Sequence, residues 1–338
     1  MIPSRRLSVF PKPQRISFEP RGNRDGLDPM RRRSPMTVCI AALCNWNYAP
    51  PGMPPDWGVA AVTTTDRMIT AGDIEYEPNQ LKCCYMTPRV LVLIAGDFPT
   101  HSEAISMVQR ALIGGGPELD VSFIASLYSD ALMAVQTREA ARKILTPLGL
   151  TLESFTNRQN ELGPNQVAEL THQLQKFRGP ETATIIVGSD DVRSHIYMID
   201  EQGTLSCQND VGFAAIGLGA WHAKSVFMSN RYVSKADFAY ALGVSYTAKK
   251  TAEIAPGVGE ATDIHYLNRY GWALLAPDIR HELSEAYNEF NAERQKLIIT
   301  AIERLRKFRP PPPLPPDTQS GDVPNASDHE GIRGDPEA

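Results

Sequence analysis

The chain has 338 residues, of which 42% are hydrophobic and 22% are charged, as in an ordinary soluble enzyme. Its formal net charge of -5 argues against a general nucleic-acid-binding surface, which should be basic. No apolar run approaches the roughly 18 residues that a membrane-spanning helix needs. The five cysteines show neither metal-ligand spacing nor a disulfide framework, so we expect no metal site and a reducing, cytoplasmic location.

The two ends of the chain are not expected to fold. Residues 1–36 are rich in Arg and Pro and poor in acids. This composition fits a disordered leader such as a transit peptide, a propeptide cut before Thr37, or a start assigned upstream of Met36. We favour the last, because a small residue directly follows Met36. Residues 309–338 are Pro-rich and acidic, and such a tail buries too little apolar surface to offset its ordering entropy. The expected globular domain is therefore 37–308.

The first part of this domain is predicted to form strands. Four runs have strand length and are rich in apolar or β-branched residues: 37–43, 58–65, 81–86 and 89–95. A Pro-rich loop separates the first two and cannot join a β-ladder. Residues 70–72 are typical of a turn, and Thr87-Pro88 predicts a hairpin between the last two runs.

Helices follow, then more strands, then more helices. The expected helices are residues 102–112, 121–145, 165–176, 221–229, 235–252 and 277–308. The expected later strands are residues 182–187, 195–199, 214–216 and 263–266. Because strands and helices come in runs rather than in strict alternation, we expect an α+β fold of packed sheets and not a doubly wound parallel sheet.

One segment carries a specific pattern. Residues 65–72 read Thr-Asp-Arg-Met-Ile-Thr-Ala-Gly, Lys82 follows, and the apolar run 90–96 ends in Ala-Gly. This succession resembles the proteasome β-subunit superfamily of N-terminal-nucleophile hydrolases. Members of that superfamily carry an Asp-Arg-x-x-Thr-x-Gly stretch, a lysine soon after it, and an apolar strand ending in Ala-Gly.

Further segments resemble the same superfamily more weakly. The opening Met36-Thr37-x-Cys39 looks most like its Anbu (ancestral β-subunit) class, in which the nucleophile follows the initiator methionine. Residues 216–220 resemble the Gly-x-Gly turn of the superfamily, and Val258-Gly259 resembles the approach to its late strand. The resemblance covers most of residues 37–271. It implies a four-layer αββα sandwich of two mainly antiparallel sheets.

The resemblance also implies a catalytic set. Thr37 would be the nucleophile, and its own α-amine would be the base, which needs no histidine. An α-amine titrates near about 7.7–8.0, and the neighbouring ammonium of Lys82 would lower that pKa. Asp66 would hold Lys82, and the amide N–H of Gly96 would face the oxyanion.

The substrate and partners follow from the same resemblance. Ile69, Cys84 and Ile94 would line a pocket for an apolar side chain. The leading hypothesis is a threonine-type peptidase that cleaves peptide or amide substrates inside a homo-oligomer without a cofactor. The sequence does not indicate whether an ATPase works with it, and a hydrolase of small acyl amides is a third option because fold does not fix substrate. Neither nucleic acid nor membrane is expected as a partner.

Each residue of the set has a simpler interpretation when taken alone. Thr37 can be a strand residue, Asp66 can begin a turn, Lys82 can be a solvated strand position, and Gly96 can end a strand. Together, in this order and spacing, they favour the catalytic interpretation.

Two departures favour a second hypothesis, a structural or binding subunit that has lost catalysis. Leu218 stands where the superfamily has a serine in its Gly-x-Gly turn. A later Asp and Ser pair has no clear counterpart, and Glu253 and Glu260 are loose substitutes. The histidines, including His101 and His195, show no ligand spacing and predict surface or satisfied core positions. Asp190-Asp191 is typical of a solvated turn.

Overall fold

The computed structural model describes residues 37–46, 58–71, 74–77, 82–114, 120–190 and 192–307. The chain divides into two units, Met1–Leu274 and Leu275–Ala338. The expected leader, the Pro-rich loop between the first two strands and the C-terminal tail lie outside the described residues. The first unit contains both five-stranded sheets, and the helix predicted over 277–308 lies in the second unit.

The first sheet has five antiparallel strands in the order β10-β1-β2-β11-β12. Their bounds are β1 Cys39–Trp46, β2 Gly58–Thr65, β10 Phe213–Ile216, β11 Asp263–Asn268 and β12 Gly271–Leu274. Cys39 is paired with Thr65 on one side and with Ile216 on the other. This register places residues 37 and 38, which precede β1, between the end of β2 and the end of β10.

The second sheet also has five antiparallel strands, in simple chain order. They are β5 Cys83–Thr87, β6 Val90–Gly96, β7 Thr182–Ser189, β8 Ser194–Ile199 and β9 Leu205–Cys207. The hairpin predicted around Thr87-Pro88 is confirmed by the pairing of β5 with β6. The short strands β9 and β12 were not predicted.

A two-stranded ribbon follows β2 and corrects one prediction. Strand β3 (Ile69–Ala71) pairs with β4 (Ile74–Tyr76), so Thr70 and Ala71 lie in a strand rather than in a turn. The β-branched residues Ile69 and Thr70 suit an extended backbone, and pairing with β4 outweighs the local turn signal.

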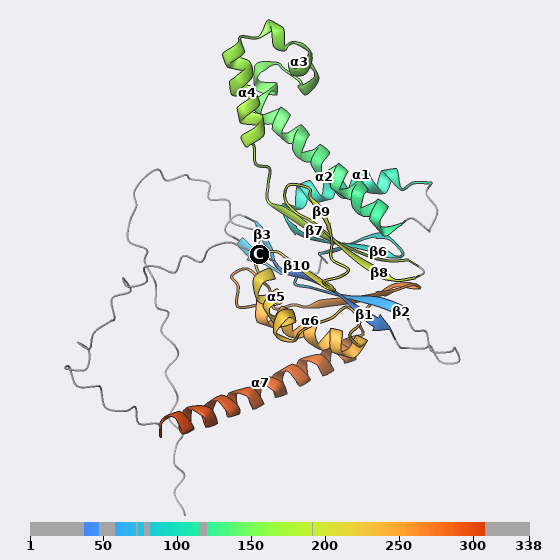
Figure 1. Cartoon of the computed structure of the whole chain (residues 1–338), viewed down its shortest axis with the longest axis vertical. Helices are drawn as coiled ribbons and strands as arrows, with labels where there is room; N and C mark the ends of the chain where they lie inside the picture. Colours follow the sequence, from blue (N-terminus) through green and yellow to red (C-terminus); the bar gives the residue numbers. More distant parts are fainter. Residues whose placement is uncertain are drawn as a thin grey trace, which may run out of the picture. The chain divides into compact units, whose positions relative to one another are not determined.

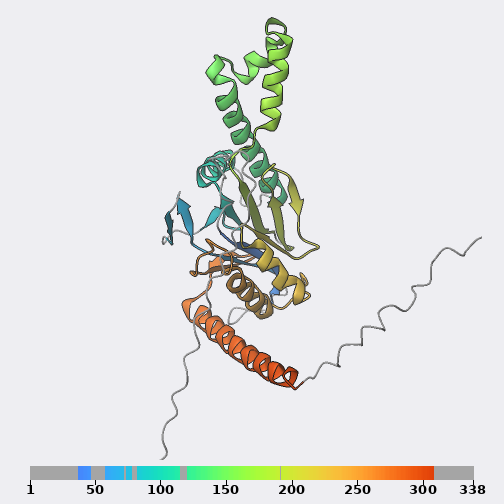
Figure 2. The ribbon, with the colours of Figure 1, turned by 90° about the vertical axis from the view of Figure 1, so that its left-hand side faces the viewer.

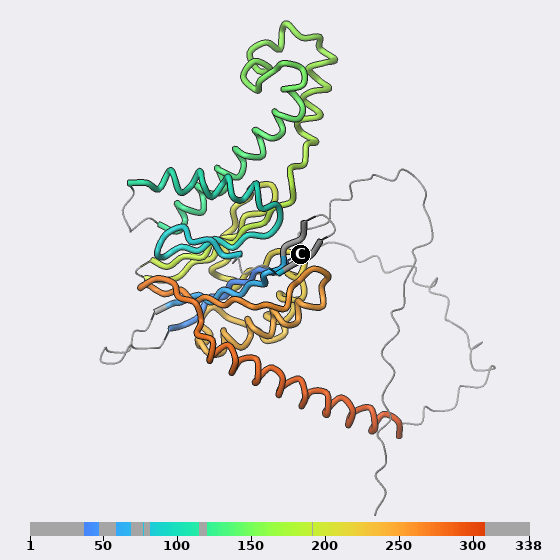
Figure 3. The backbone as a smooth tube through the Cα atoms, turned by 180° about the vertical axis from the view of Figure 1, so that it is seen from behind, coloured from blue at the N-terminus to red at the C-terminus, as the bar shows by residue number. Residues whose placement is uncertain are grey.

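Helices cover the outer faces of both sheets in the first unit. Figure 1 and Figure 3 show α1 (Phe98–Ala111) and α2 (Val121–Ile144) on the second sheet, and Figure 1 shows α5 (Ala220–Ser229) and α6 (Phe238–Ala252) on the first. Between the sheets, a cluster of buried side chains joins β1 and β2 to β6, β7 and β8. The expected α+β fold with two packed antiparallel sheets is therefore confirmed.

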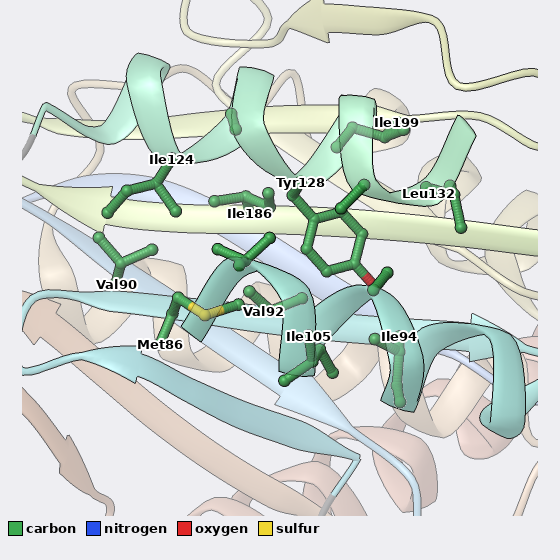
Figure 4. Packing of buried hydrophobic residues seen from close by; sticks show 14 of the residues in the cluster. Met86, Val90, Val92, Ile94, Ile105, Ile124, Tyr128, Leu132, Ile186 and Ile199 are labelled. Atoms are coloured by element: carbon green, nitrogen blue, oxygen red, sulfur yellow. The ribbon is translucent and has the colours of Figure 1, made fainter. Parts of the chain in front are cut away.

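Strand β6 shows why its sequence is a continuous apolar run. Its side chains alternate between two buried faces, since one set packs under the helices and the other packs between the sheets. The helix-facing set is Val90, Val92 and Ile94, and the set between the sheets is Leu91, Leu93 and Ala95. Figure 4 shows the helix-facing cluster, in which Tyr128 and Ile124 of α2 pack over β6 and β7. Each fully buried large side chain contributes about 1.5–3 kcal/mol.

Capping residues explain where two helices begin. The α1 helix starts at Phe98, four residues before the predicted start, because the Asp97 side chain accepts the amide of Thr100. The α6 helix starts at Phe238, later than predicted, because Asp237 caps it in the same way. Such caps stabilise a helix by about 0.5–2 kcal/mol each.

A helical extension leaves the second sheet through the C-terminal part of α2 (Figure 2). It continues through two short 3-10 turns, Thr146–Leu148 and Gln159–Glu161, the unpredicted helix α3 (Leu152–Asn157) and the predicted α4 (Pro164–Lys176). Leu145, Phe155 and Leu170 form its own small core. In the second unit, α7 spans Pro277–Leu305, and none of its residues is buried. Within the described ranges, no helix is long and apolar enough to cross a membrane.

Candidate active site

Three of the predicted site residues meet where strands of both sheets begin or end. Thr37 precedes β1, Asp66 follows β2, and Lys82 precedes β5. The Lys82 Nζ atom donates to Thr37 Oγ1 at 2.6 Å and to Asp66 Oδ1 at 3.0 Å. The Thr37 hydroxyl donates to the same carboxylate oxygen at 2.5 Å. The hydroxyl, the ammonium and the carboxylate therefore form a closed triangle.

Backbone amides fix the Asp66 carboxylate. The amide of Val38 donates to Oδ1 at 3.1 Å, and the amides of Met68 and Gly259 donate to Oδ2 at 3.1 and 3.0 Å. Asp66 is fully buried, so these donors replace the water that a buried charge loses. With both oxygens engaged, the carboxylate has a defined orientation and holds the ammonium of Lys82 against Thr37.

The turn after β10 contacts Thr37 from the other side. Gly217 has φ +87°, and a Cβ atom there would lie 2.3 Å from the Thr37 carbonyl oxygen. The Gly219 amide donates to that same oxygen at 3.2 Å. The turn therefore positions Thr37 through the backbone of its two glycines, whereas the side chain of Leu218 is 37% exposed. Glycine is required at Gly217 for both its φ and this close approach.

The amide of Gly96 points toward the side of β6 on which Lys82 lies. Ile94 donates its amide to the Lys82 carbonyl at 3.4 Å, and Asp97 donates its amide to the Glu181 carbonyl on the opposite side at 3.0 Å. Because amides alternate in direction along a strand, the Gly96 N–H shares the direction of Ile94. Gly96 has φ +110°, and a Cβ there would lie 2.1 Å from the Glu181 oxygen, so only glycine fits.

No family model and no curated protein matches the sequence. The chemistry of the site therefore has to be argued from its contacts. Among the described residues, no group of three or more His, Cys, Asp or Glu side chains is placed to hold a metal ion.

The three predicted pocket residues have different surroundings. Ile94 is 5% exposed and belongs to the cluster under α1 and α2, and the half-buried Cys84 of the neighbouring strand packs against that cluster. Ile69 lies in β3, but its side chain is outside the described residues. A shared pocket for all three remains a prediction.

Cys39 lies next to the site without joining its chemistry. Its thiol donates to the Ile94 carbonyl at 3.4 Å. Burial raises the pKa of Cys39 to about 12, although the nearby Lys82 ammonium acts in the opposite direction. A thiol with this pKa stays protonated at neutral pH and is a poor nucleophile.

A buried lysine that the sequence did not single out supports the site from behind. Lys249 of α6 is fully buried and donates to the carbonyls of Gly259 at 2.8 Å and Glu260 at 2.7 Å. It also pairs with Glu253, which contacts Lys250 as well. Burial lowers the pKa of Lys249, and the hydrogen bond that Lys249 donates to Glu253 opposes that effect.

Lys249 thus fixes the loop whose Gly259 amide binds Asp66. Glu253, a loose candidate for a second acid near Thr37, is instead engaged by the two lysines. The available signal was Lys249 itself, a lysine that follows a helix segment rich in apolar residues. The adjacent Lys250 concealed it, because two consecutive lysines are typical of a solvated helix end.

Proposed function

We propose that this chain is a threonine-type peptidase or amide hydrolase in which Thr37 is the nucleophile. The observation that carries the proposal is the 2.6 Å contact between Lys82 Nζ and Thr37 Oγ1, with Asp66 bound to both groups. An ammonium against a hydroxyl oxygen favours the negative charge that develops on that oxygen during attack. The site has little solvent access, which strengthens this electrostatic effect.

The base in this proposal is the α-amine of Thr37, which is free only when Thr37 is the first residue. An α-amine titrates near about 7.7–8.0, and an adjacent ammonium disfavours its protonated form. The neutral amine accepts the proton of the Thr37 hydroxyl as Oγ1 forms a bond to the substrate carbonyl carbon. The amine then returns that proton to the leaving nitrogen as the C–N bond breaks. Water next hydrolyses the acyl ester and restores the hydroxyl.

The Gly96 amide supplies the electrophilic part of the proposal. Its N–H points to the Lys82 side, where the carbonyl oxygen of a substrate attacked by Thr37 would become negative. A preorganised donor of this kind typically contributes about 3–4 kcal/mol to the transition state.

The fold and the order of these residues support the likeness to the proteasome β-subunit superfamily described above. The likeness, together with outward-facing apolar side chains on α5, supports a homo-oligomer as the working form. Trp221 and Met228 are 81% and 61% exposed on that helix. All five cysteines are free thiols, which supports a cytoplasmic location.

A catalytically inactive binding subunit is the second candidate. It is favoured by Leu218, which leaves no hydroxyl in the Gly217–Gly219 turn, and by Glu253, which is paired with Lys249. Under this alternative the triangle at Thr37 is only a buried polar contact.

Mass and activity measurements separate the two candidates. We expect the intact mass of the natively expressed protein to match a chain whose first residue is Thr37. We also expect this protein to hydrolyse peptides that have an apolar residue just before the scissile bond. Thr37→Ser should retain part of this activity, whereas Thr37→Ala should lose it at an unchanged melting temperature. Small acyl amides tested beside peptides distinguish an amidase from a peptidase. A protein with a free Thr37 amine that cleaves neither substrate class would overturn the proposal.

A further inference from the structure

A buried hydrogen-bonded pair ends on the peptide bond that precedes Gly96. His101 of α1 and Tyr128 of α2 are both fully buried. The His101 Nδ1 atom lies 2.9 Å from the Tyr128 hydroxyl, and Nε2 lies 3.0 Å from the carbonyl oxygen of Ala95. Figure 4 shows Tyr128 crossing the helix-facing cluster with its hydroxyl on the side where Ile94 lies.

The chemistry of these partners fixes the direction of each hydrogen bond. A carbonyl oxygen only accepts, so His101 Nε2 carries the proton and donates to Ala95. The neutral ring then accepts at Nδ1 from the Tyr128 hydroxyl. Burial lowers the pKa of His101, which keeps the ring neutral and preserves this arrangement.

The Ala95 carbonyl and the Gly96 amide belong to one planar peptide unit. In a trans peptide the C=O and the N–H point in opposite directions. A donor bound to the carbonyl therefore orients the N–H as well, and it polarises the unit so that the N–H becomes a stronger donor. Lys82 lies on the N–H side of this unit, and His101 binds its carbonyl side.

We propose that His101, held by Tyr128, is a positioning residue that orients and polarises the Gly96 amide as the oxyanion donor. The proposal rests on the proposed hydrolase function, because an oxyanion forms only during acyl transfer. Under this proposal α1 and α2 support the site through His101 and Tyr128, although neither helix contributes a group to the Thr37 triangle. A merely structural pair would affect folding stability and leave the transition state unchanged.

Kinetics with a matched control test this role. Tyr128→Phe removes one hydroxyl, and His101→Leu removes the donor to Ala95. Because deleting a whole oxyanion donor costs about 10²–10³ in kcat, we expect His101→Leu to lower kcat about 10–100-fold and Tyr128→Phe about 3-fold, with KM unchanged. The control is Tyr232→Phe, which also removes a buried tyrosine hydroxyl bound to a carbonyl, that of Leu43 at 2.6 Å, and should keep kcat.

A tetrahedral analogue gives the decisive reading. A peptide boronate accepts Thr37 Oγ1 at boron and presents an oxygen where the oxyanion forms, so its affinity should fall by the same factor as kcat. Folded His101→Leu with wild-type kcat and boronate affinity would overturn the proposal.

A measurement on the resting protein separates this proposal from the hydrolase itself. The ¹⁵N chemical shift of the Gly96 amide should move in Tyr128→Phe and stay in place in Tyr232→Phe. If the wild-type protein cleaves no substrate but the Gly96 shift changes in Tyr128→Phe, the proposed hydrolase function is wrong and the effect of the hydrogen bonds on the Gly96 amide stands. An active wild type with an unresponsive Gly96 shift would reject the role of His101 alone.

Discussion

Two polar clusters lie at opposite ends of β7, and only the cluster at Thr37 places a cation against a hydroxyl oxygen. Gly96 pairs with Thr182 at the start of β7, near Thr37 and Lys82, whereas Asp190 follows its last residue. At that far end the His195 Nε2 atom lies 2.8 Å from Asp190 Oδ2, and Asn209 donates to His195 Nδ1 at 2.9 Å. The Asp190–His195 pair resembles a catalytic dyad more than the Thr37 triangle does.

The two clusters differ in whether their reactive groups are already fully hydrogen-bonded within the protein. Both ring nitrogens of His195 are engaged, and Asp190 accepts the amides of Val192 and Arg193 at 2.7 Å each. These bonds close the turn between β7 and β8. At Thr37, by contrast, the Lys82 ammonium is bound directly to the hydroxyl oxygen of the proposed nucleophile. A perturbing charge next to a reactive atom is a better indication of catalysis than the residue types alone.

The largest expected effect tests this difference directly. Lys82→Ala removes the cation from Thr37 Oγ1 and should lower kcat/KM about 10²–10⁴-fold, as for loss of an acid–base group. His195→Gln should keep kcat/KM within a factor of about two, because its bonds serve a remote turn. Both are measured by peptide hydrolysis after folding is checked by circular dichroism. Equal losses in the two variants would remove the distinction.

The next effect concerns the lysine behind the site. Lys249→Met removes the ammonium that binds two backbone carbonyls and Glu253. We expect the free energy of unfolding to fall by about 3 kcal/mol. This is the low end of the range for a broken buried ion pair, because Glu253 still pairs with Lys250. The neighbouring Lys250→Met is the matched control and should cost less than about 1 kcal/mol. Urea denaturation measures both. Similar losses of unfolding free energy in the two variants would show that Lys249 does not stabilise the Gly259 loop.

A smaller effect is expected at the far end of β7. Asp190→Ala removes the acceptor of two turn amides and of His195. Because the Asp190 side chain is 40% exposed and water can replace part of these contacts, the cost should be about 1–2 kcal/mol. Activity should be unchanged. A loss of hydrolysis in this variant without a loss of stability would mean that this end of the sheet takes part in catalysis.

The smallest effect is a dependence of stability on pH. Burial lowers the pKa of His101 from its ordinary value of 6.5, so below 6.5 the unfolded chain binds a proton that the folded chain does not. The contribution of His101 is therefore complete above pH 6.5 and declines as the pH falls toward the folded pKa. Urea titrations at several pH values should show that His101→Leu flattens this slope, whereas Tyr232→Phe keeps it. An unaltered slope in His101→Leu would contradict the assignment of a neutral ring.

The sequence by itself predicted the longer strands and the residues that meet at Thr37. Strand β2 has the predicted bounds, and α2 and α4 are within one residue of theirs. In α2 the buried residues recur at helical spacing, and this pattern is visible in the sequence. Asp66, Lys82 and Gly96 were predicted because their order and spacing resemble a superfamily pattern. Their side-chain types carry the chemistry, so they leave a pattern in the sequence.

Only the tertiary structure decided which groups surround Thr37, Asp66, Lys82 and Gly96. Lys249 lies more than a hundred residues along the chain from Lys82, and the amides of Gly259 and Gly219 are groups that every non-proline residue has. His101 and Tyr128 read as ordinary helix residues until the packing of α1 and α2 on β6 brings them to the Ala95 carbonyl. Backbone donors and long-range buried contacts have no local signature, because they exist only when distant segments are packed together.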